Sequence, residues 1–107
     1  MRKIVLICTG GLSTGLLLNK IKKKAKELGE EFDISAHGVN EVDECCKEAD
    51  VILVGPQVRY ALDQIKTKFP EKPIGEIDMH TYGRMKGDVV LETAISLLQA
   101  EENEWSR

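Results

Sequence analysis

Residues 3–21 read KIVLICTGGLSTGLLLNKI, and this stretch decides which fold the rest of the chain can adopt. Residues 4–7 form an apolar, mostly β-branched run, which predicts a strand buried in a parallel sheet. Small and hydroxyl-bearing residues then interrupt the apolar pattern from Cys8 to Gly15. Helical spacing of leucine and isoleucine follows, with lysines on the other face and Gly29 as a C-terminal stop. The stretch therefore predicts a strand, a glycine-rich loop and a helix, with a cysteine where the strand ends.

The predicted loop has the composition of an anion-binding site. The first turn of a helix leaves backbone N–H groups unpaired and carries partial positive charge. Glycines let the backbone approach a phosphate-sized group, and Thr9, Ser13 and Thr14 add hydroxyl donors. Cys8 stands at the edge of this cradle, where the helix N-terminus is expected to lower the pKa of its thiol below about 8.5 and make it a nucleophile. The alternative interpretation is a small buried cysteine that ends a strand.

Three better-known loops do not match this stretch. Gly10 and Gly15 have the spacing of a nucleotide-binding P-loop, but leucines follow where Lys and Ser/Thr are required. No G-x-G-x-x-G occurs, so a dinucleotide fingerprint is missing as well. Cysteine-dependent phosphatases place an arginine six residues after the cysteine, and here that residue is Thr14. The loop therefore lacks the cation expected to stabilise the transition state of hydrolysis.

Composition narrows the class of protein. At 107 residues the chain is expected to form one domain over residues 1–107. A formal charge of −3 argues against general nucleic-acid binding. The apolar runs are too short to span a bilayer and no signal-peptide pattern is present, which predicts a cytoplasmic location. The 3 cysteines include no C-x-x-C pair, which argues against a disulfide framework or a structural zinc site.

The middle of the chain predicts an edge strand and a short helix. Residues 32–39 alternate apolar and polar side chains, as in a strand with one less buried face. Asn40 is expected to cap a helix over residues 41–48. The inward-facing residues of that helix are predicted to be Val42, Cys45 or Cys46, and Ala49.

His37 and the adjacent Cys45 and Cys46 raise the question of a metal site. One histidine and two neighbouring cysteines cannot easily present their ligands on one side of a helix. We therefore predict no metal ion here, and we interpret the two cysteines as core or incidental thiols.

A second strand, loop and helix follow in residues 51–70. Residues 51–54 read VILV and predict a buried strand, which a Gly-Pro pair ends before helical spacing leads to Pro70. The carboxyl ends of parallel strands meet at one sheet edge, so Gln57 and Tyr60 are candidates for contacts around Cys8. For Gln57, a polar cap at the helix start is an equally good interpretation.

The last third predicts one more strand and a closing helix. The strand begins at Pro73 and reaches Asp78, and residues 80–87 are expected to form a polar turn. An amphipathic helix capped by Asp88 follows. Residues 101–107 are expected to form a polar tail, with Trp105 as a loosely packed contact.

Four strands alternating with helices predict an α/β fold with a parallel sheet covered by helices on both faces. Ligands in such sheets bind where the strand order reverses. In a sheet of order 2-1-3-4 the reversal falls beside the first strand. Topology and local chemistry therefore both place the site at Cys8.

Three segments carry a family resemblance. They are residues 7–17 (ICTGGLSTGLL), residues 53–58 (LVGPQV) with Tyr60, and residues 72–74 (KPI) leading to Ile77-Asp78 and Tyr82-Gly83. These segments resemble the enzyme IIB component of the lactose/cellobiose class of the phosphoenolpyruvate-dependent sugar phosphotransferase system. The resemblance spans nearly the whole chain and implies the architecture of the low-molecular-weight tyrosine phosphatases.

This resemblance implies a cytoplasmic phosphocarrier that needs no metal or cofactor. Cys8 would take a phosphoryl group from a phosphohistidine of the IIA component and pass it to a sugar brought in by the membrane component IIC. The sugar would be a β-linked disaccharide such as cellobiose, lactose or chitobiose. Tyr82 joins Gln57 and Tyr60 as a residue at the edge of the site. The phosphoryl-binding loop would comprise Thr9, Gly10, Gly11, Leu12, Ser13, Thr14 and Gly15.

The loop departs mildly from the family pattern. Gly10 and Leu12 stand where alanine and methionine are common, and Gly15 stands where serine often appears. Backbone N–H groups are the main donors, so the carrier role is unaffected. The competing interpretation is a small cysteine phosphatase or an arsenate-reductase-like enzyme, which the missing arginine disfavours.

Overall fold

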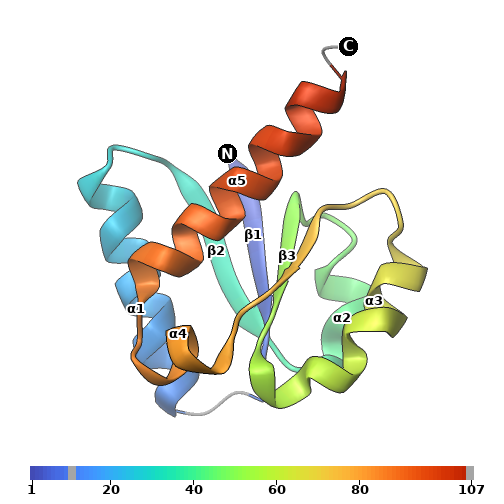
Figure 1. Cartoon of the computed structure of the whole chain (residues 1–107), viewed down its shortest axis with the longest axis horizontal. Helices are drawn as coiled ribbons and strands as arrows, with labels where there is room; N and C mark the ends of the chain where they lie inside the picture. The colour runs from blue at the N-terminus through green and yellow to red at the C-terminus, as the bar shows by residue number, and fades with distance from the viewer. Residues whose placement is uncertain (10–11, 106–107) are drawn as a thin grey trace.

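A parallel sheet of four strands, in the order β2-β1-β3-β4, forms the centre of the molecule (Figure 1). The computed structural model describes residues 1–9 and 12–105, and side chains up to residue 100 apart from residues 12 and 13. The strands are β1 (Arg2–Ile7), β2 (Phe32–His37), β3 (Val51–Val54) and β4 (Ile74–Glu76). The helices are α1 (Leu12–Glu27), η1 (Val39–Glu41), α2 (Val42–Cys45), η2 (Pro56–Ala61), α3 (Leu62–Lys68), α4 (Met79–Gly83) and α5 (Gly87–Trp105).

The strand β1 lies inside the sheet, as its apolar run predicts. It pairs in parallel with β2 on one side and β3 on the other, so that Ile4 faces Ile34 and Val51 across the two ladders. The side chains of residues 4–7 are fully buried. The predicted order 2-1-3-4 and the edge position of β2 are therefore confirmed.

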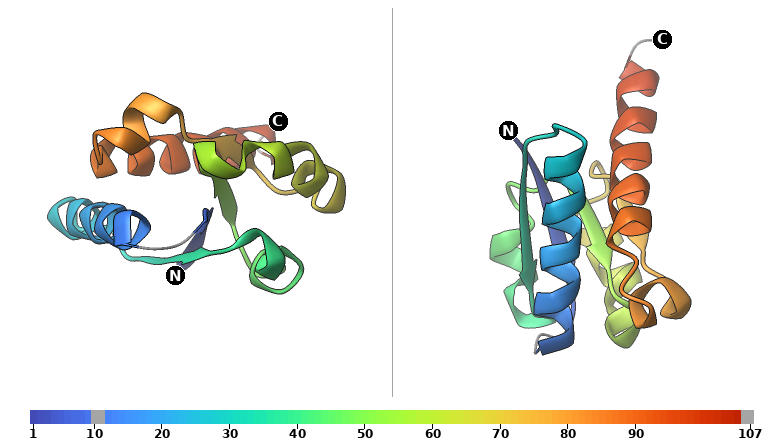
Figure 2. Two further views of the ribbon diagram at one scale, coloured as in Figure 1. Left: turned by 90° about the horizontal axis from the view of Figure 1, so that it is seen from below. Right: turned by 90° about the vertical axis from the view of Figure 1, so that its left-hand side faces the viewer.

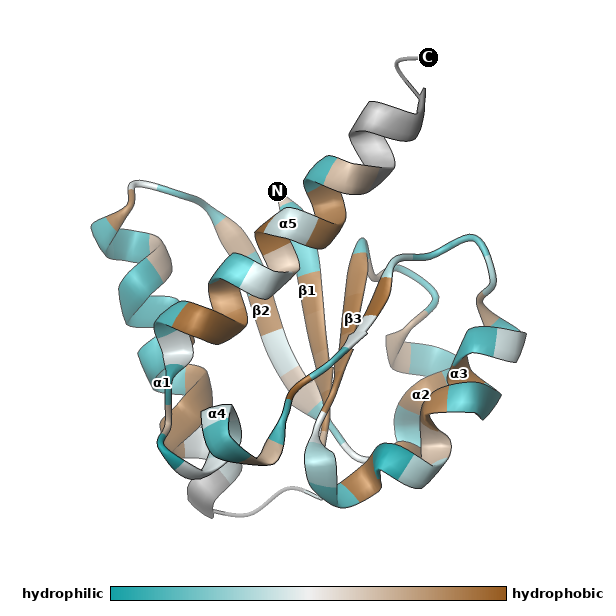
Figure 3. Ribbon diagram, in the orientation of Figure 1, coloured by the Kyte–Doolittle hydropathy of each residue, from teal (hydrophilic) through white to brown (hydrophobic). Residues whose placement is uncertain are grey.

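Alternating side chains of β1 enter two separate cores. Ile4 and Leu6 pack with residues of α1 and α5, whereas Val5 and Ile7 pack with residues of α2, η2 and α3. Figure 2 shows these helices on opposite sides of the sheet, and Figure 3 shows apolar residues concentrated on the strands and the helix faces toward them. Helices on both faces are confirmed, and burial on both sides explains why residues 4–7 of β1 and all four residues of β3 are apolar.

The segment after β2 differs from its prediction. It begins with the single turn η1, whose N-cap is Gly38, so Asn40 lies inside the turn and the prediction that it caps a helix is wrong. Glu41 accounts for this start, because its Oε2 accepts a hydrogen bond of 3.0 Å from the Gly38 N–H. The following helix α2 spans only four residues. Of the two cysteines there, Cys46 is buried and Cys45 is partly exposed.

The polar turn expected over residues 80–87 contains the short helix α4 instead. Asp78 caps this helix, since its Oδ1 accepts a hydrogen bond of 2.6 Å from the Thr81 N–H. An aspartate before a helix is a recognisable sequence signal, but the glycine and polar residues that follow Asp78 favoured the prediction of a turn. The strand β4 ends at Glu76, short of the predicted Asp78, although the Ile77 N–H still donates to the Val54 carbonyl at 2.9 Å.

The closing helix α5 is longer than predicted at both ends. It begins at Gly87, so Asp88 lies in the first turn and the prediction that it is the N-cap is wrong. In the first turn its negative charge still interacts favourably with the helix dipole. It continues to Trp105, so residues 101–105 of the expected tail have helical backbone. Among the helices of the described residues, none is both long and apolar enough to cross a membrane.

Candidate active site

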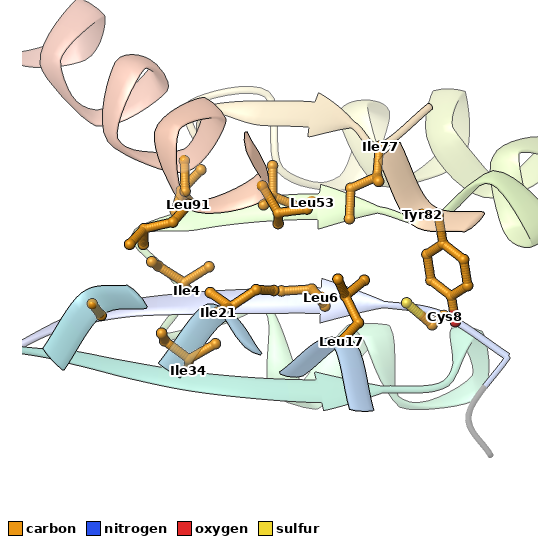
Figure 4. Close-up of a cluster of buried hydrophobic side chains, with 14 of the residues drawn as sticks. Ile4, Leu6, Cys8, Leu17, Ile21, Ile34, Leu53, Ile77, Tyr82 and Leu91 are labelled. Carbon is orange, nitrogen blue, oxygen red and sulfur yellow. The ribbon is translucent and has the colours of Figure 1, made fainter. Parts of the chain in front are cut away.

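Cys8 lies directly after β1, at the carboxyl edge of the sheet. Its N–H donates a hydrogen bond of 2.9 Å to the His37 carbonyl, which extends the pairing of β1 and β2 by one residue. Strand alternation turns its side chain to the same face as Ile4 and Leu6, where it is fully buried at the end of that core (Figure 4). The thiol is therefore held by the regular geometry of a central strand.

Two hydroxyl-bearing residues cover the Cys8 thiol. Thr14 in the first turns of α1 is 4% exposed and makes a side-chain hydrogen bond to the thiol. The Thr14 Oγ1 lies 2.8 Å from the hydroxyl oxygen of Tyr82, which α4 carries and which is 6% exposed. Figure 4 shows the Tyr82 ring reaching from α4 to Cys8. A hydrogen-bonded chain thus runs from Tyr82 through Thr14 to Cys8, and it places Tyr82 in the interior of the site.

The surroundings of Cys8 raise the pKa of its thiol. Burial is the larger cause, because a thiolate loses its hydration, and the hydrogen bond from Thr14 opposes the rise. The prediction of a lowered pKa is therefore wrong for the thiol in this arrangement. The loop residues Gly10 and Gly11, whose N–H groups were expected to stabilise the anion, lie outside the described residues.

Of the other predicted loop residues, two are exposed and two have side chains that the structure does not describe. Thr9 is exposed beside Cys8, and Gly15 is exposed on α1. A Cβ on Gly15 would meet no described atom within 4 Å, so the serine often found there in similar loops would fit. Leu12 and Ser13 begin α1, and their side chains fall outside the description.

The Gly-Pro-Gln segment after β3 contacts the thiol from the other side. A Cβ on Gly55 would lie 3.1 Å from the Cys8 Sγ, 3.2 Å from the Gln57 Oε1 and 3.3 Å from the Ile7 carbonyl oxygen. A side chain at position 55 would therefore crowd these groups, and the Gln57 Oε1 and the Cys8 Sγ both lie close to Gly55. A contact between Gln57 and the group on Cys8 stays a prediction. Tyr60 on η2 is 78% exposed, which makes it a surface residue.

A pocket of about 400 Å³ opens beside the cysteine, between the ends of β1 and β2. Sequence reasoning placed Thr9 and Thr14 at the site but missed the contribution of the segment after β2. The available signal was topological, because β2 is the parallel neighbour of β1 and ends at the same edge. The described lining residues are Thr9, Thr14, Ala36, His37, Gly38, Asn40 and Glu41.

The other two cysteines belong to a different part of the molecule. Cys46 packs in the core on the opposite face of the sheet, and its Sγ lies 3.8 Å from that of Cys45. Burial and the neighbouring thiol raise the pKa of Cys46 to about 12, and burial also raises the pKa of Cys45. Neither thiol faces the pocket beside Cys8.

We expect the substitution Tyr82→Phe to raise the pKa of Cys8 further. Without its hydroxyl partner, Thr14 is a weaker hydrogen-bond donor to the thiolate, and the thiolate fraction below the pKa falls. The alkylation rate of Cys8 near neutral pH should drop by about threefold to tenfold, and its pH profile should move to higher pH. The matched control is Tyr60→Phe, which removes an exposed hydroxyl. Equal profiles for the two variants would refute the hydrogen-bonded chain.

These features define a small α/β domain with a parallel sheet, in which the first strand ends in a hydrogen-bonded cysteine at the carboxyl edge of the sheet. Comparison with known proteins makes the assignment specific. The family model described as the lactose/cellobiose-specific IIB subunit of the PTS system matches residues 3–93, and the chain belongs to this family. It is thus a IIB component of a sugar phosphotransferase system.

Individual relatives are similar over nearly their whole length. The oligo-β-mannoside-specific EIIB component of Bacillus subtilis is 37% identical over 100 residues, covering 92% of this chain and 97% of the relative. The galactose-specific EIIB component of Lactococcus lactis is 35% identical, covering 89% and 94%. The solution structure of the cellobiose-specific IIB component from Borrelia burgdorferi matches with a TM-score of 0.80 at 31% identity, covering 94% of both chains.

Proposed function

We propose that this chain is a cytoplasmic phosphocarrier in which Cys8 takes a phosphoryl group from a phosphohistidine of a IIA component. Cys8 then transfers it to a sugar that the membrane component IIC delivers. The observation that carries the proposal is the hydrogen-bonded cysteine at the carboxyl end of β1, in a chain of the IIB family. The relatives named for oligo-β-mannosides, galactose and cellobiose support sugars as the substrate class.

The chemistry consists of two in-line displacements at phosphorus. The Cys8 thiol first loses its proton, and the sulfur attacks the phosphorus while the P–N bond of the phosphohistidine breaks and its electron pair returns to the imidazole. In the second step the sugar hydroxyl attacks, the S–P bond breaks, the thiolate leaves and the hydroxyl proton is released. Backbone N–H groups of the loop at the start of α1 would share the phosphoryl charge in both steps.

The position six residues after the cysteine favours a carrier over a phosphatase. Thr14 occupies this position and binds the thiol with its hydroxyl. It therefore supplies a hydrogen bond and no positive charge. A carrier must keep its phosphoryl group from water until the acceptor arrives, and a site without a fixed guanidinium at that position suits this requirement.

The burial of Cys8 means that transfer requires a local rearrangement. The thiol is fully buried, so the incoming phosphorus can reach it only after the side chain turns toward the sheet edge or its cover opens. Thr9, the next residue along the chain, is exposed. We infer that docking of the phosphorylated partner drives this rearrangement, because docking supplies binding energy at this edge of the sheet.

The sheet edge around Cys8 carries exposed apolar side chains suited to protein partners. Leu16, Tyr60 and Met79 are 49%, 78% and 68% exposed. They belong to α1, η2 and α4, which follow the carboxyl ends of β1, β3 and β4. The start of α1, η2 and α4 lie at the lower edge of Figure 1. Large apolar and aromatic side chains at an exposed edge are typical of protein interfaces. This supports docking of IIA and IIC at the same edge.

The proposal is tested by incubating the full chain with phosphorylated IIA that carries labelled phosphate. We expect stoichiometric transfer to this chain, with the chemical lability of an S-phosphate and not that of an N-phosphate, and the labelled peptide should contain Cys8. Absence of transfer would refute the carrier role. Turnover of an aryl phosphate without IIA would instead support the phosphatase alternative.

A further inference from the structure

One residue that lines the pocket beside Cys8 also contacts the Cys8 thiol. Thr14 lines the pocket and also donates to the Cys8 thiol. Gly38 lines it from the other side, and a Cβ on Gly38 would lie 4.0 Å from the Cys8 carbonyl oxygen. The backbone bond of 2.9 Å between the Cys8 N–H and the His37 carbonyl holds the two sides together. A molecule in this pocket would therefore lie next to the group carried on Cys8.

A fixed carboxylate dominates the chemistry of the pocket. The Glu41 Oε2 accepts the 3.0 Å hydrogen bond from the Gly38 N–H, and its Oε1 lies 3.5 Å from the His37 Nδ1. The hydrogen bond from Gly38 and the bond to His37 both lower the pKa of Glu41. The His37 Nε2 is itself 3.0 Å from the Ser35 Oγ, which fixes the imidazole ring. Glu41 is therefore ionised and oriented at neutral pH.

The remaining polar groups select a neutral ligand with many hydroxyls. Thr9 and Thr14 contribute hydroxyls and Asn40 contributes a carboxamide, while the described lining residues include no lysine or arginine. At the side of the pocket formed by the segment after β2, the ionised carboxylate has no lysine or arginine among the described lining residues, and this disfavours a free phosphate or a nucleotide there. It favours hydroxyl groups, which donate to the carboxylate and exchange hydrogen bonds with the amide. A volume of about 400 Å³ is within the usual range for small-molecule sites.

We propose that this pocket receives the ring of the acceptor sugar, so that the IIB chain contributes its own contacts to the sugar during phosphoryl transfer. Asn40 and Glu41 would bind its hydroxyls, and His37 is a positioning residue for Glu41. The inference rests on the proposed carrier function and specifies where its substrate lies. It assigns to the segment after β2 a role in sugar recognition that the cysteine loop does not supply.

The direct test is a titration of the unphosphorylated full chain with glucose and with cellobiose, followed by amide chemical shifts. We expect saturable shifts at residues 37–41, and weaker shifts at these residues with inorganic phosphate. The substitution Asn40→Ala should weaken sugar binding by about fivefold, the equivalent of one hydrogen bond. The matched control is Asn19→Ala, which removes an exposed asparagine from α1. Absence of sugar-dependent shifts, or equal weakening by the two variants, would overturn the proposal.

A second variant separates the pocket from the carrier function. Glu41→Gln keeps an oxygen acceptor for the Gly38 N–H but removes the charge, so sugar binding should weaken and the discrimination against phosphate should diminish. Both pocket variants should still accept label from phosphorylated IIA at the wild-type rate, and in the complete system with IIC they should raise the KM for sugar. If labelling of the wild-type chain fails, the carrier function is wrong. If labelling succeeds but KM is unchanged in both variants, the pocket proposal alone is wrong.

Discussion

Cys8→Ser is expected to lower the rate of phosphoryl acceptance from phosphorylated IIA by more than about a hundredfold. A serine hydroxyl has nearly the shape of the thiol but ionises far less readily, and its alkoxide is not available near neutral pH. The fold should be retained, because Thr14 offers the new hydroxyl a hydrogen-bond partner in this buried position. The measurement is transfer of label from IIA, with thermal unfolding as the check on the fold.

The matched control is Cys45→Ser, which removes another thiol from the same chain. Cys45 is partly exposed on α2 and contacts Cys46, whereas Cys8 belongs to the core on the opposite face. This variant should accept label as the wild type does. If the Cys8→Ser variant accepted label at the wild-type rate, a different residue would carry the phosphoryl group and the proposed mechanism would be wrong.

Gly87→Ala is expected to lower the free energy of unfolding by about 3 kcal/mol. A Cβ at this position would lie 2.7 Å from the Lys20 carbonyl carbon and 2.8 Å from the Ile21 nitrogen. Both are backbone atoms of α1, so the clash cannot be relieved by rotating a side chain. The start of α5 would have to move away from α1, and this pair of helices covers the core that contains Cys8. Urea denaturation measures the change.

The matched control is Gly83→Ala at the end of α4. A Cβ there would meet no described atom within 4 Å, so the free energy of unfolding should change by no more than about 0.5 kcal/mol. Equal denaturation midpoints for the two alanine variants would show that α1 and α5 are not in the close contact described.

The central strands were predictable because their signal is local. Residues 4–7 and 51–54 are apolar at every position, as a strand covered on both faces requires, and right-handed crossovers then restrict the strand order. The short elements were harder. Asn40 is a good cap residue in isolation, but the Glu41 side chain captures the Gly38 N–H and starts the turn two residues earlier. Helix α4 depends on Asp78 within a segment that otherwise reads as a turn.

In the candidate site, too, some features were predictable from local sequence and others were not. The position of Cys8 at the end of β1 was predictable from the break in the apolar pattern. The partnership between Thr14 and Tyr82 was not, since the two residues are 68 positions apart and only the packing of α4 against α1 and β1 joins them. The pocket residues after β2 were missed for a related reason, because only pairing of β2 with β1 brings them to Cys8.

The amino-acid sequence alone determined a parallel α/β domain with a cysteine at the end of its first strand, because hydrophobic periodicity and a glycine-rich break act between near neighbours in the chain. Only the tertiary structure decided the state of that cysteine. The pKa of Cys8 depends on how much water the packing of α1 and α4 excludes, and here burial outweighs the hydrogen bond from Thr14. Solvation is a property of groups gathered from distant parts of the chain, so the local motif does not contain it.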